Sequence, residues 1–319
     1  MKLTILLTGK NGQVGGELLN LLPQLGEVIA FGHGQLDLSN PSDIRRTIRE
    51  VRPQLIVNAA AYTAVDQAET DETTAQAVNA EAPGVMAEEA KKIGAALVHY
   101  STDFVFDGTK KLPYDEADSP NPINVYGKSK FAGEQAIRGS GLSHLIFRTS
   151  WVYATRGRNF LLTILRLACE REELRIVSDQ VGAPTCASDV AAATAKILIK
   201  MLGMNDSGFA FSEVSGTYHM SAAGQTTWYD FAKTIVEQAQ STSHKLEWLA
   251  AATKERLLIT RRVLPISTVE FGSSTHRPAY SILSNSHLIQ TFGFALPHWH
   301  AQLQRCFVSN GIAARHGAD

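Results

Sequence analysis

Residues 2–15 read KLTILLTGKNGQVG, and this stretch predicts the fold of the chain. The apolar run from Lys2 to Thr8 has the length and the Leu and Ile content of a buried strand. Three glycines follow with the spacing G-x-x-G-x-x-G, which differs from the common G-x-G-x-x-G, and helical spacing resumes from Glu17 to Leu22. A strand, a glycine loop and a helix in this order predict a dinucleotide site in which a pyrophosphate meets the helix N-terminus.

Strand-like and helical segments alternate through the first half of the chain. Further strands are expected at 27–31, 54–60, 96–102 and 144–152, with helices at 41–51, 72–93 and 126–137. Such alternation predicts an α/β fold, a Rossmann-like doubly wound parallel sheet. Ligands of these sheets bind beyond the carboxyl ends of the strands. The residues expected at those ends include Asn58, Ser101, Thr102 and Thr149.

A second stretch, Tyr126-Gly127-Lys128-Ser129-Lys130, predicts the chemistry. Tyr126 and Lys130 are four residues apart, so on a helix both side chains lie on one face. A phenol with an ordinary pKa of about 10 is a poor acid or base at neutral pH, and a positive charge beside it lowers that pKa. The same spacing occurs on ordinary surface helices, but downstream of a nucleotide loop it indicates hydride transfer at a carbonyl.

The composition favours small-molecule partners. The 319 residues are 44% apolar and 19% charged, which suffices for one large domain or a domain with a smaller lobe. The net charge of -1 and the pI of about 6.8 favour neither nucleic acid nor an acidic membrane surface. The apolar N-terminal segment is too short for a signal peptide or a membrane span, so a cytoplasmic location is expected.

Cysteines and histidines give no metal site on their own. Cys169, Cys186 and Cys306 are widely separated and form no C-x-x-C pair, which favours reduced thiols over a disulfide framework or a zinc site. His298 and His300 are two residues apart, and on a helix this spacing points the rings in different directions.

Several segments together resemble a known family. They are 9–15 (GKNGQVG), 57–66 (VNAAAYTAVD), 99–106 (HYSTDFVF), 124–130 (NVYGKSK), 147–153 (FRTSWVY), 179–185 (DQVGAPT) and 277–278 (RP). The set is similar to that of the extended short-chain dehydrogenase/reductases and, more narrowly, of the dTDP-4-dehydrorhamnose reductase family. The resemblance spans nearly the whole chain. It implies NAD(P)H-dependent reduction of the C4 keto group of dTDP-4-dehydro-6-deoxy-L-mannose to dTDP-L-rhamnose, the last step of dTDP-rhamnose synthesis.

By this resemblance the catalytic residues are Thr102, Tyr126 and Lys130. Tyr126 would donate a proton to the C4 oxygen as hydride arrives from the nicotinamide. Lys130 would hold the ribose hydroxyls of the cofactor and favour the phenolate, and Thr102 would hydrogen-bond the reacting oxygen.

The resemblance also implies a set of binding residues. Those for the cofactor are Gly9, Asn11, Gly12, Gln13, Val14 and Gly15 at the phosphates, Asp37 and Leu38 at the adenine, and Ala61, Tyr62, Thr63 and Tyr100 along its length, with Tyr126 and Lys130. Those for the substrate are Val65, Thr102, Asp103, Trp151 and Arg277. Arg277 would meet a substrate phosphate, and it is equally explained as a surface arginine before Pro278.

Two positions depart from the family pattern. Phe31-Gly32-His33-Gly34 lacks the carboxylate that normally binds the ribose 2′-hydroxyl of NAD and would repel a 2′-phosphate. NADPH is therefore expected, with His33 as a candidate contact and NADH as the alternative. Some family members hold Mg²⁺ between two subunits through glutamates. Glu17 matches one of these glutamates, but Ser188-Asp189 stands where another is expected, so Mg²⁺ and the choice between monomer and homodimer stay open.

The expected domains are an NAD(P)-binding domain over 1–179, with returns of the chain, and a smaller, mainly substrate-binding lobe over 180–319, with helices at 187–202 and 227–240. The alternative functions are another nucleotide-sugar reductase, epimerase or dehydratase, and a non-enzymatic cofactor-binding regulatory subunit. Dehydratases carry Asp-Glu after the threonine, and here Phe104 replaces the glutamate. The complete triad disfavours the regulatory subunit. The expected partner is a small nucleotide sugar, without nucleic acid or membrane.

Overall fold

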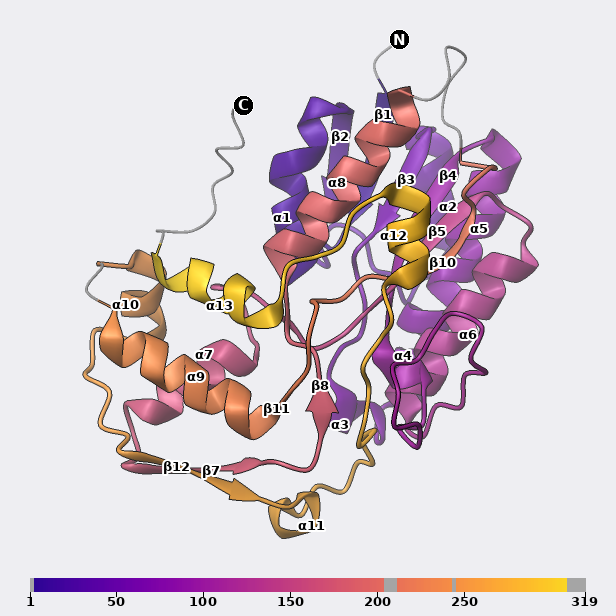
Figure 1. The fold of residues 1–319 in the computed structure, drawn as a ribbon. Helices are drawn as coiled ribbons and strands as arrows, with labels where there is room; N and C mark the ends of the chain where they lie inside the picture. Colours follow the sequence, from indigo (N-terminus) through magenta and orange to yellow (C-terminus); the bar gives the residue numbers. More distant parts are fainter. Residues whose placement is uncertain (1–2, 204–210, 243–244, 309–319) are drawn as a thin grey trace.

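A six-stranded sheet forms the centre of the larger part of the molecule (Figure 1). The computed structural model describes residues 3–203, 211–242 and 245–308. The strands are ordered β2 (Gly26–Phe31), β1 (Leu3–Thr8), β3 (Leu55–Asn58), β4 (Ala96–Thr102), β5 (His144–Thr149) and β10 (Gly216–His219). All neighbouring strands are parallel. The chain adds β2 on one side of β1 and β3 on the other, so the expected doubly wound sheet is confirmed, with its switch point between β1 and β3.

Helices cover both faces of this sheet because successive strand residues point to opposite sides. One layer consists of α1 (Gln13–Leu21), α8 (Ala187–Gly203) and α12 (Ser286–Phe292), and the other of α2 (Pro41–Val51), α5 (Ala82–Ile93) and α6 (Val125–Gly139). Ile5 and Leu7 pack with the first layer, whereas Leu6 packs with the second. The alternation gives the sheet two separate apolar cores.

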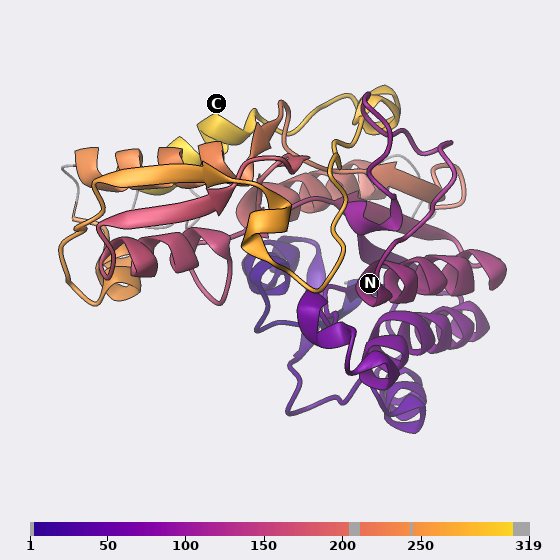
Figure 2. The ribbon, with the colours of Figure 1, turned by 90° about the horizontal axis from the view of Figure 1, so that it is seen from below.

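A smaller lobe has a third core. Its elements are α7 (Phe160–Ala168), α9 (Trp228–Ser241), α10 (Glu247–Thr253), α13 (Trp299–Val308) and a parallel ribbon of β7 (Glu173–Val177) and β12 (Arg262–Ile266). Figure 2 shows this ribbon running along α7 and α9, beside the helices of the larger part. Two short strand pairs complete the connections, β6 (Val152–Tyr153) with β9 (Thr185–Cys186) and β8 (Val181–Gly182) with β11 (Thr226–Thr227).

The chain passes between the two parts more than once. α7 and β7 precede residue 180 but lie in the smaller lobe, whereas α8, β10 and α12 follow it and complete the larger part. The expected division of function at residue 179 stays a prediction, since the elements on each side of that residue contribute to both parts. No helix within the described residues is long and apolar enough to cross a membrane.

Residues 72–93, expected as one helix, form α4 (Glu72–Gln76), a π-helical turn (Ala77–Glu81) and α5. Pro83 has no N–H to donate to the carbonyl of Asn79, and its ring would crowd that carbonyl in a regular helix. The displaced carbonyl approaches α6 closely, because a Cβ added to Gly133 would lie 2.1 Å from the Asn79 oxygen. The π turn therefore sets the position of α6, which carries Tyr126 and Lys130.

Candidate active site

The loop after β1 leaves room for an anion at the start of α1. A Cβ on Gly9, whose φ is +74°, would lie 2.7 Å from the backbone of Ala60, and a Cβ on Gly15 would lie 2.1 Å from the Gly9 oxygen. No side chain caps the N-terminus of α1, and its first turn has no acidic residue. The positive end of this helix is therefore open, as a bound pyrophosphate requires. The described residues fit a dinucleotide here.

Two residues that sequence reasoning missed, Arg156 and Asn159, hold this loop from the segment before α7. Asn159 Nδ2 donates to Gln13 Oε1 over 2.9 Å, and one Arg156 nitrogen donates to the Gln13 carbonyl over 2.8 Å. Arg156 also pairs with Glu17 over 3.1 Å. Asn159 caps α7, so an asparagine directly before the apolar run from Phe160 was an available sequence signal. No comparable signal marks Arg156.

The candidate adenine-side residues follow β2. A Cβ on Gly32 would lie 2.7 Å from Asn11 Nδ2, so the Asn11 side chain lies against this glycine. His33 is exposed and Leu38 is buried. The Asp37 carboxylate accepts from the Ser39 hydroxyl over 2.7 Å and from its backbone N–H over 2.9 Å, and these bonds lower the pKa of Asp37. Asp37 thus stabilises its own turn.

Asn79 fixes the loop after β3. Its amide bonds both the N–H and the carbonyl of Tyr62, each over 2.9 Å, and donates to Ser129 on α6 over 3.0 Å. The segment Ala61–Thr63 is thereby fastened to the helix that carries Tyr126. Val65 begins α3 (Val65–Ala68) directly afterwards.

Tyr126 lies in the first turn of α6, near the end of β4. Asn124 caps the helix, its Oδ1 accepting from Gly127 N over 2.7 Å. Burial raises the pKa of Tyr126 to about 12, Thr102 opposes the shift, and Asp103 adds to it. The expected lowering of this pKa by Lys130 is not found, because burial raises the pKa and the interaction that lowers it comes from Thr102. The phenol is therefore protonated at neutral pH and can act as a proton donor.

Asp103 is a buried carboxylate beside this phenol. It accepts from Thr102 Oγ1 over 3.1 Å and from Ser150 Oγ over 2.9 Å. Burial raises its pKa to about 6, and the nearby Ser281 hydroxyl together with the hydrogen bonds from Ser150 and Thr102 opposes the shift.

The Lys130 side chain runs into the interior. Its Nζ donates to the Tyr100 carbonyl over 2.6 Å and lies 3.2 Å from His99 Nε2. Burial lowers the pKa of Lys130 to about 8, and the charge of Glu134 opposes the shift. The Tyr100 hydroxyl is paired with Thr194 over 2.7 Å, so Tyr100 meets the site through its backbone.

Trp151 has a left-handed backbone with φ +46° and is held by a ring stack. Its indole lies on that of Trp228, with centroids 3.4 Å apart and planes inclined by 4°. A Cβ on Gly182 would lie 2.2 Å from the Trp151 ring, and Trp228 Nε1 donates to Gln180 Oε1 over 3.2 Å. Strained backbone supported in this way is typical of functional sites. Sequence reasoning did not assign Trp228 or Gln180 to the site.

Arg277 is tied to protein groups. Its guanidinium pairs with Asp66 on α3 over 2.6 Å. Asn124 Nδ2 also donates to the backbone of His276 over 2.9 Å. These contacts connect the segment of His276 and Arg277 to α3 and α6. Shortly after this segment, Tyr280 pairs with Val181 of β8. The phosphate contact of Arg277 stays a prediction.

The described residues contain no group of three or more His, Cys, Asp or Glu side chains that could hold a metal ion. Glu17 pairs with Arg156, and Asp189 pairs with Arg305.

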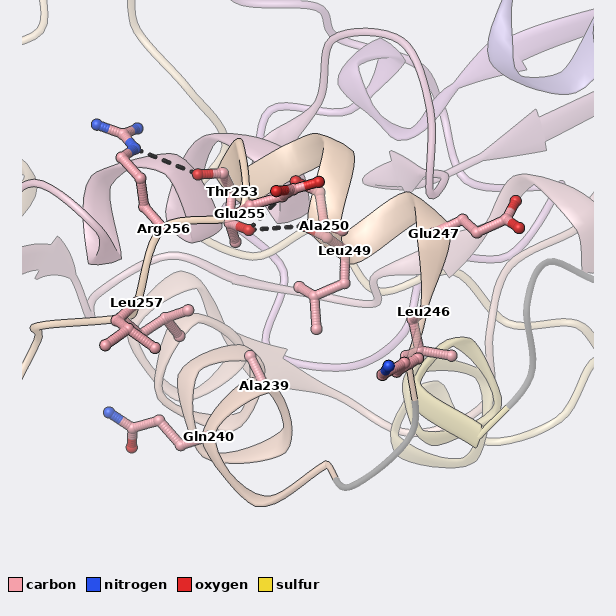
Figure 3. Close-up of a pocket in the computed structure, with 12 residues that line it drawn as sticks. Ala239, Gln240, Leu246, Glu247, Leu249, Ala250, Thr253, Glu255, Arg256 and Leu257 are labelled. Carbon is pink, nitrogen blue, oxygen red and sulfur yellow. Dashed lines mark hydrogen bonds between the residues drawn. The ribbon is translucent and has the colours of Figure 1, made fainter.

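A separate hollow lies in the smaller lobe, between α9, α10 and the segment that follows α10 (Figure 3). Leu246, Leu249, Ala250 and Leu257 are among its lining residues. None of the candidate catalytic, cofactor or substrate residues lines it, so it is not part of the candidate active site.

The chain is similar to known proteins over nearly its whole length. The family model "RmlD substrate binding domain" matches residues 1–310. A dTDP-4-dehydrorhamnose reductase of Burkholderia thailandensis is 47% identical over 95% of this chain and 97% of that protein. One of Escherichia coli K12 is 42% identical over 95% of this chain and 96% of that protein.

Solved structures of related proteins have a similar fold. The crystal structure of a Bacillus anthracis dTDP-4-dehydrorhamnose reductase in complex with NADP has a TM-score of 0.83 and 37% identity, covering 97% of this chain and 99% of that one. A Thermus thermophilus UDP-glucose 4-epimerase complex with NAD has a TM-score of 0.74 but 18% identity, covering 96% of this chain and 98% of that one, and shares the fold alone.

Proposed function

This chain belongs to the family of the RmlD substrate binding domain and of the dTDP-4-dehydrorhamnose reductases, and we propose that it makes dTDP-L-rhamnose. The reaction is the NAD(P)H-dependent reduction of the C4 keto group of dTDP-4-dehydro-6-deoxy-L-mannose. The observation that carries the proposal is the gathering of Thr102, Tyr126 and Lys130 at the carboxyl end of β4 and in the first two turns of α6, in a sheet whose first strand leads to an open helix N-terminus.

The proposed cofactor is NADPH, which supplies the hydride when bound. The relative from Bacillus anthracis was solved with NADP, and Gly32-His33-Gly34 offers no carboxylate to repel a 2′-phosphate. The glycine loop and the start of α1 would hold the pyrophosphate, with Asn11 and Gln13 beside it. His33 would lie at the 2′-phosphate.

Tyr126 is the proposed proton donor to the C4 oxygen. Its phenol keeps its proton at neutral pH because its pKa is raised, and the proton would pass to the carbonyl oxygen as hydride arrival makes that oxygen basic. Thr102 donates its single O–H to Asp103 and accepts from the Phe104 N–H, so to hydrogen-bond this oxygen it would turn its hydrogen from Asp103 to the substrate. Lys130 would hold the ribose hydroxyls and stabilise the phenolate that remains.

The sugar nucleotide would lie against the stacked Trp151 and near Val65 and Asp103. Arg277 already pairs with Asp66, so a substrate phosphate would compete with that carboxylate for the guanidinium. This competition limits the net gain from that contact, because the arginine already has an anionic partner.

An NADPH oxidation assay with dTDP-4-dehydro-6-deoxy-L-mannose, with analysis of the product, tests the proposal. Stoichiometric oxidation of NADPH and formation of dTDP-L-rhamnose are expected. A dehydratase or epimerase would recycle its cofactor without net oxidation, and a regulatory subunit would turn over neither compound. The absence of net oxidation would refute the proposal.

A further inference from the structure

A chain of buried polar side chains runs behind Lys130, across three strands. It links Thr8 on β1, Asn58 on β3 and His99 on β4 to Lys130 on α6, and each of the four is at most 2% exposed. The Thr8 hydroxyl lies 2.7 Å from Asn58 Oδ1, Asn58 Nδ2 lies 3.1 Å from His99 Nδ1, and His99 Nε2 lies 3.2 Å from Lys130 Nζ. None of the first three residues has a role in the reaction proposed above.

The direction of these hydrogen bonds is set at Asn58. The Ala60 backbone N–H lies 3.3 Å from Asn58 Oδ1, and a backbone N–H can only donate, so this atom must be the amide oxygen. The amide nitrogen therefore faces His99 and donates to Nδ1. A neutral imidazole that accepts at Nδ1 carries its proton on Nε2.

The Nε2–H of His99 thus points at the Lys130 nitrogen. A neutral amine has a lone pair that accepts this hydrogen, whereas an ammonium has none. To face an ammonium favourably, His99 would need its proton on Nδ1, opposite the Asn58 amide hydrogens. Turning the Asn58 amide would instead set its nitrogen against the Ala60 N–H. Either change loses a hydrogen bond in a buried place, where such a loss is costly.

We propose that His99, oriented by Asn58, is a positioning residue that opposes protonation of Lys130, so that NADPH binding is accompanied by proton uptake at this lysine. The inference rests on the proposed function, in which the ammonium of Lys130 holds the ribose hydroxyls. According to this proposal, the buried residues His99 and Asn58 lower NADPH affinity, and the effect increases with pH.

The other ionisable groups around Lys130 act in known directions. Glu134, one turn further along α6, favours the ammonium, but its carboxylate is engaged by Arg148 from β5 over 2.9 and 2.7 Å. Tyr126, one turn earlier, is protonated, and Asp103 acts on that phenol. His99 itself stays neutral, since burial holds its pKa well below the usual range. His99 is therefore the titratable group in contact with the amine.

The test measures NADPH affinity between pH 7.5 and 10, a range in which the 2′-phosphate does not titrate. For the wild type we expect affinity to fall as the pH rises through the pKa of Lys130, by at most about tenfold per pH unit for one proton. In His99→Gln the amide reaches the position of Nε2 and can present its oxygen to the ammonium. The fall in NADPH affinity should then occur at higher pH. At pH 9.5 we expect the variant to bind NADPH about tenfold more tightly than the wild type, because the change in pKa corresponds to about one hydrogen bond.

Two further proteins complete the design. Asn58→Ala removes the donor to Nδ1, so the shift should have the same direction. His144→Gln makes the same replacement at another buried histidine, at the first residue of β5, and should leave the pH dependence as in wild type. A thermal melt of each variant checks that it is folded.

Calorimetry of the wild type in two buffers of different ionisation enthalpy needs no variant and should show proton uptake on NADPH binding at pH 8.5. An unshifted pH dependence in the folded His99→Gln and Asn58→Ala proteins, or binding without proton uptake, overturns the inference alone. Failure of the wild type to bind NADPH at any pH overturns the proposed function with it.

Discussion

Burial raises the pKa of two side chains at the end of β4 and the start of α6, with different consequences for each. It raises the pKa of Tyr126 to about 12, which keeps a proton available for the proposed reaction. It also raises the pKa of Asp103 to about 6, so ionised Asp103 carries a cost at neutral pH. Tyr126, whose raised pKa suits the proposed reaction, and Asp103, whose raised pKa lowers stability, thus lie in the same buried surroundings.

Replacing Tyr126 with Phe keeps the ring but deletes the proton donor. We expect kcat to fall by roughly 100-fold or more, because general acid catalysis commonly contributes that much. NADPH affinity should stay near wild type. Single-turnover kinetics and a cofactor titration measure the two quantities, and a variant that retains turnover would show that another group supplies the proton.

Asp103→Asn should stabilise the protein at neutral pH. The pKa of Asp103 is raised from 3.8 to about 6, so its contribution to stability is full below pH 4 and is lost as the pH rises through 6. Above that pH the ionised group lowers the free energy of unfolding by up to about 3 kcal/mol. Urea unfolding should show a gain at pH 7.5 that disappears at pH 4. An equal gain at both values would mean that charge is not its cause.

At the scale of elements, sequence patterns predicted what depends on local periodicity. The five strands β1 to β5 and the helices α2, α6, α8 and α9 lie within a few residues of the expected ranges. Thr227 caps α9, since its hydroxyl accepts from Asp230 N over 3.0 Å. β10 was missed because it is four residues long and joins the sheet only through tertiary pairing with β5.

The candidate site was predictable where residues follow strand ends and unpredictable where it depends on distant contacts. Tyr126, Lys130 and the glycine loop were found from spacing. The stack of Trp151 on Trp228 joins residues far apart in sequence, and the hydrogen bonds of Asn79 depend on a π turn that no periodicity marks. Such contacts become visible only when the elements are assembled.

The loop after β2 should decide cofactor preference. We expect kcat/KM with NADPH to be at least that with NADH, and Gly32→Asp to move the preference toward NADH, because the new carboxylate would repel a 2′-phosphate and bind a 2′-hydroxyl. The added side chain must displace the end of the Asn11 side chain, whose Nδ2 lies 2.7 Å from the added Cβ. Gly32→Asn, of the same size but uncharged, is the matched control. A strong NADH preference of the wild type would contradict the reading of this loop.

At the scale of the whole molecule, the surface around Glu17 bears on assembly. Glu17 and Asp189 each pair with an arginine, and hard cations need several converging oxygens. We therefore expect turnover to persist after treatment with a chelator. Light scattering beside the activity assay reports the oligomeric state. Loss of a dimer and of turnover, both restored by Mg²⁺, would show that a site forms between subunits.

The chain passes between the two parts of the molecule more than once, and this constrains how the protein can fold during synthesis on the ribosome. When β7 has been synthesised, five strands of the sheet exist, but α8 and β10 do not. Leu7 and Val57 then still face water on the side that Val190 and Ile197 later cover. Multidomain chains commonly fold their N-terminal domain first during synthesis. Here the nucleotide-binding half cannot finish folding before the other has begun, so the two must mature together.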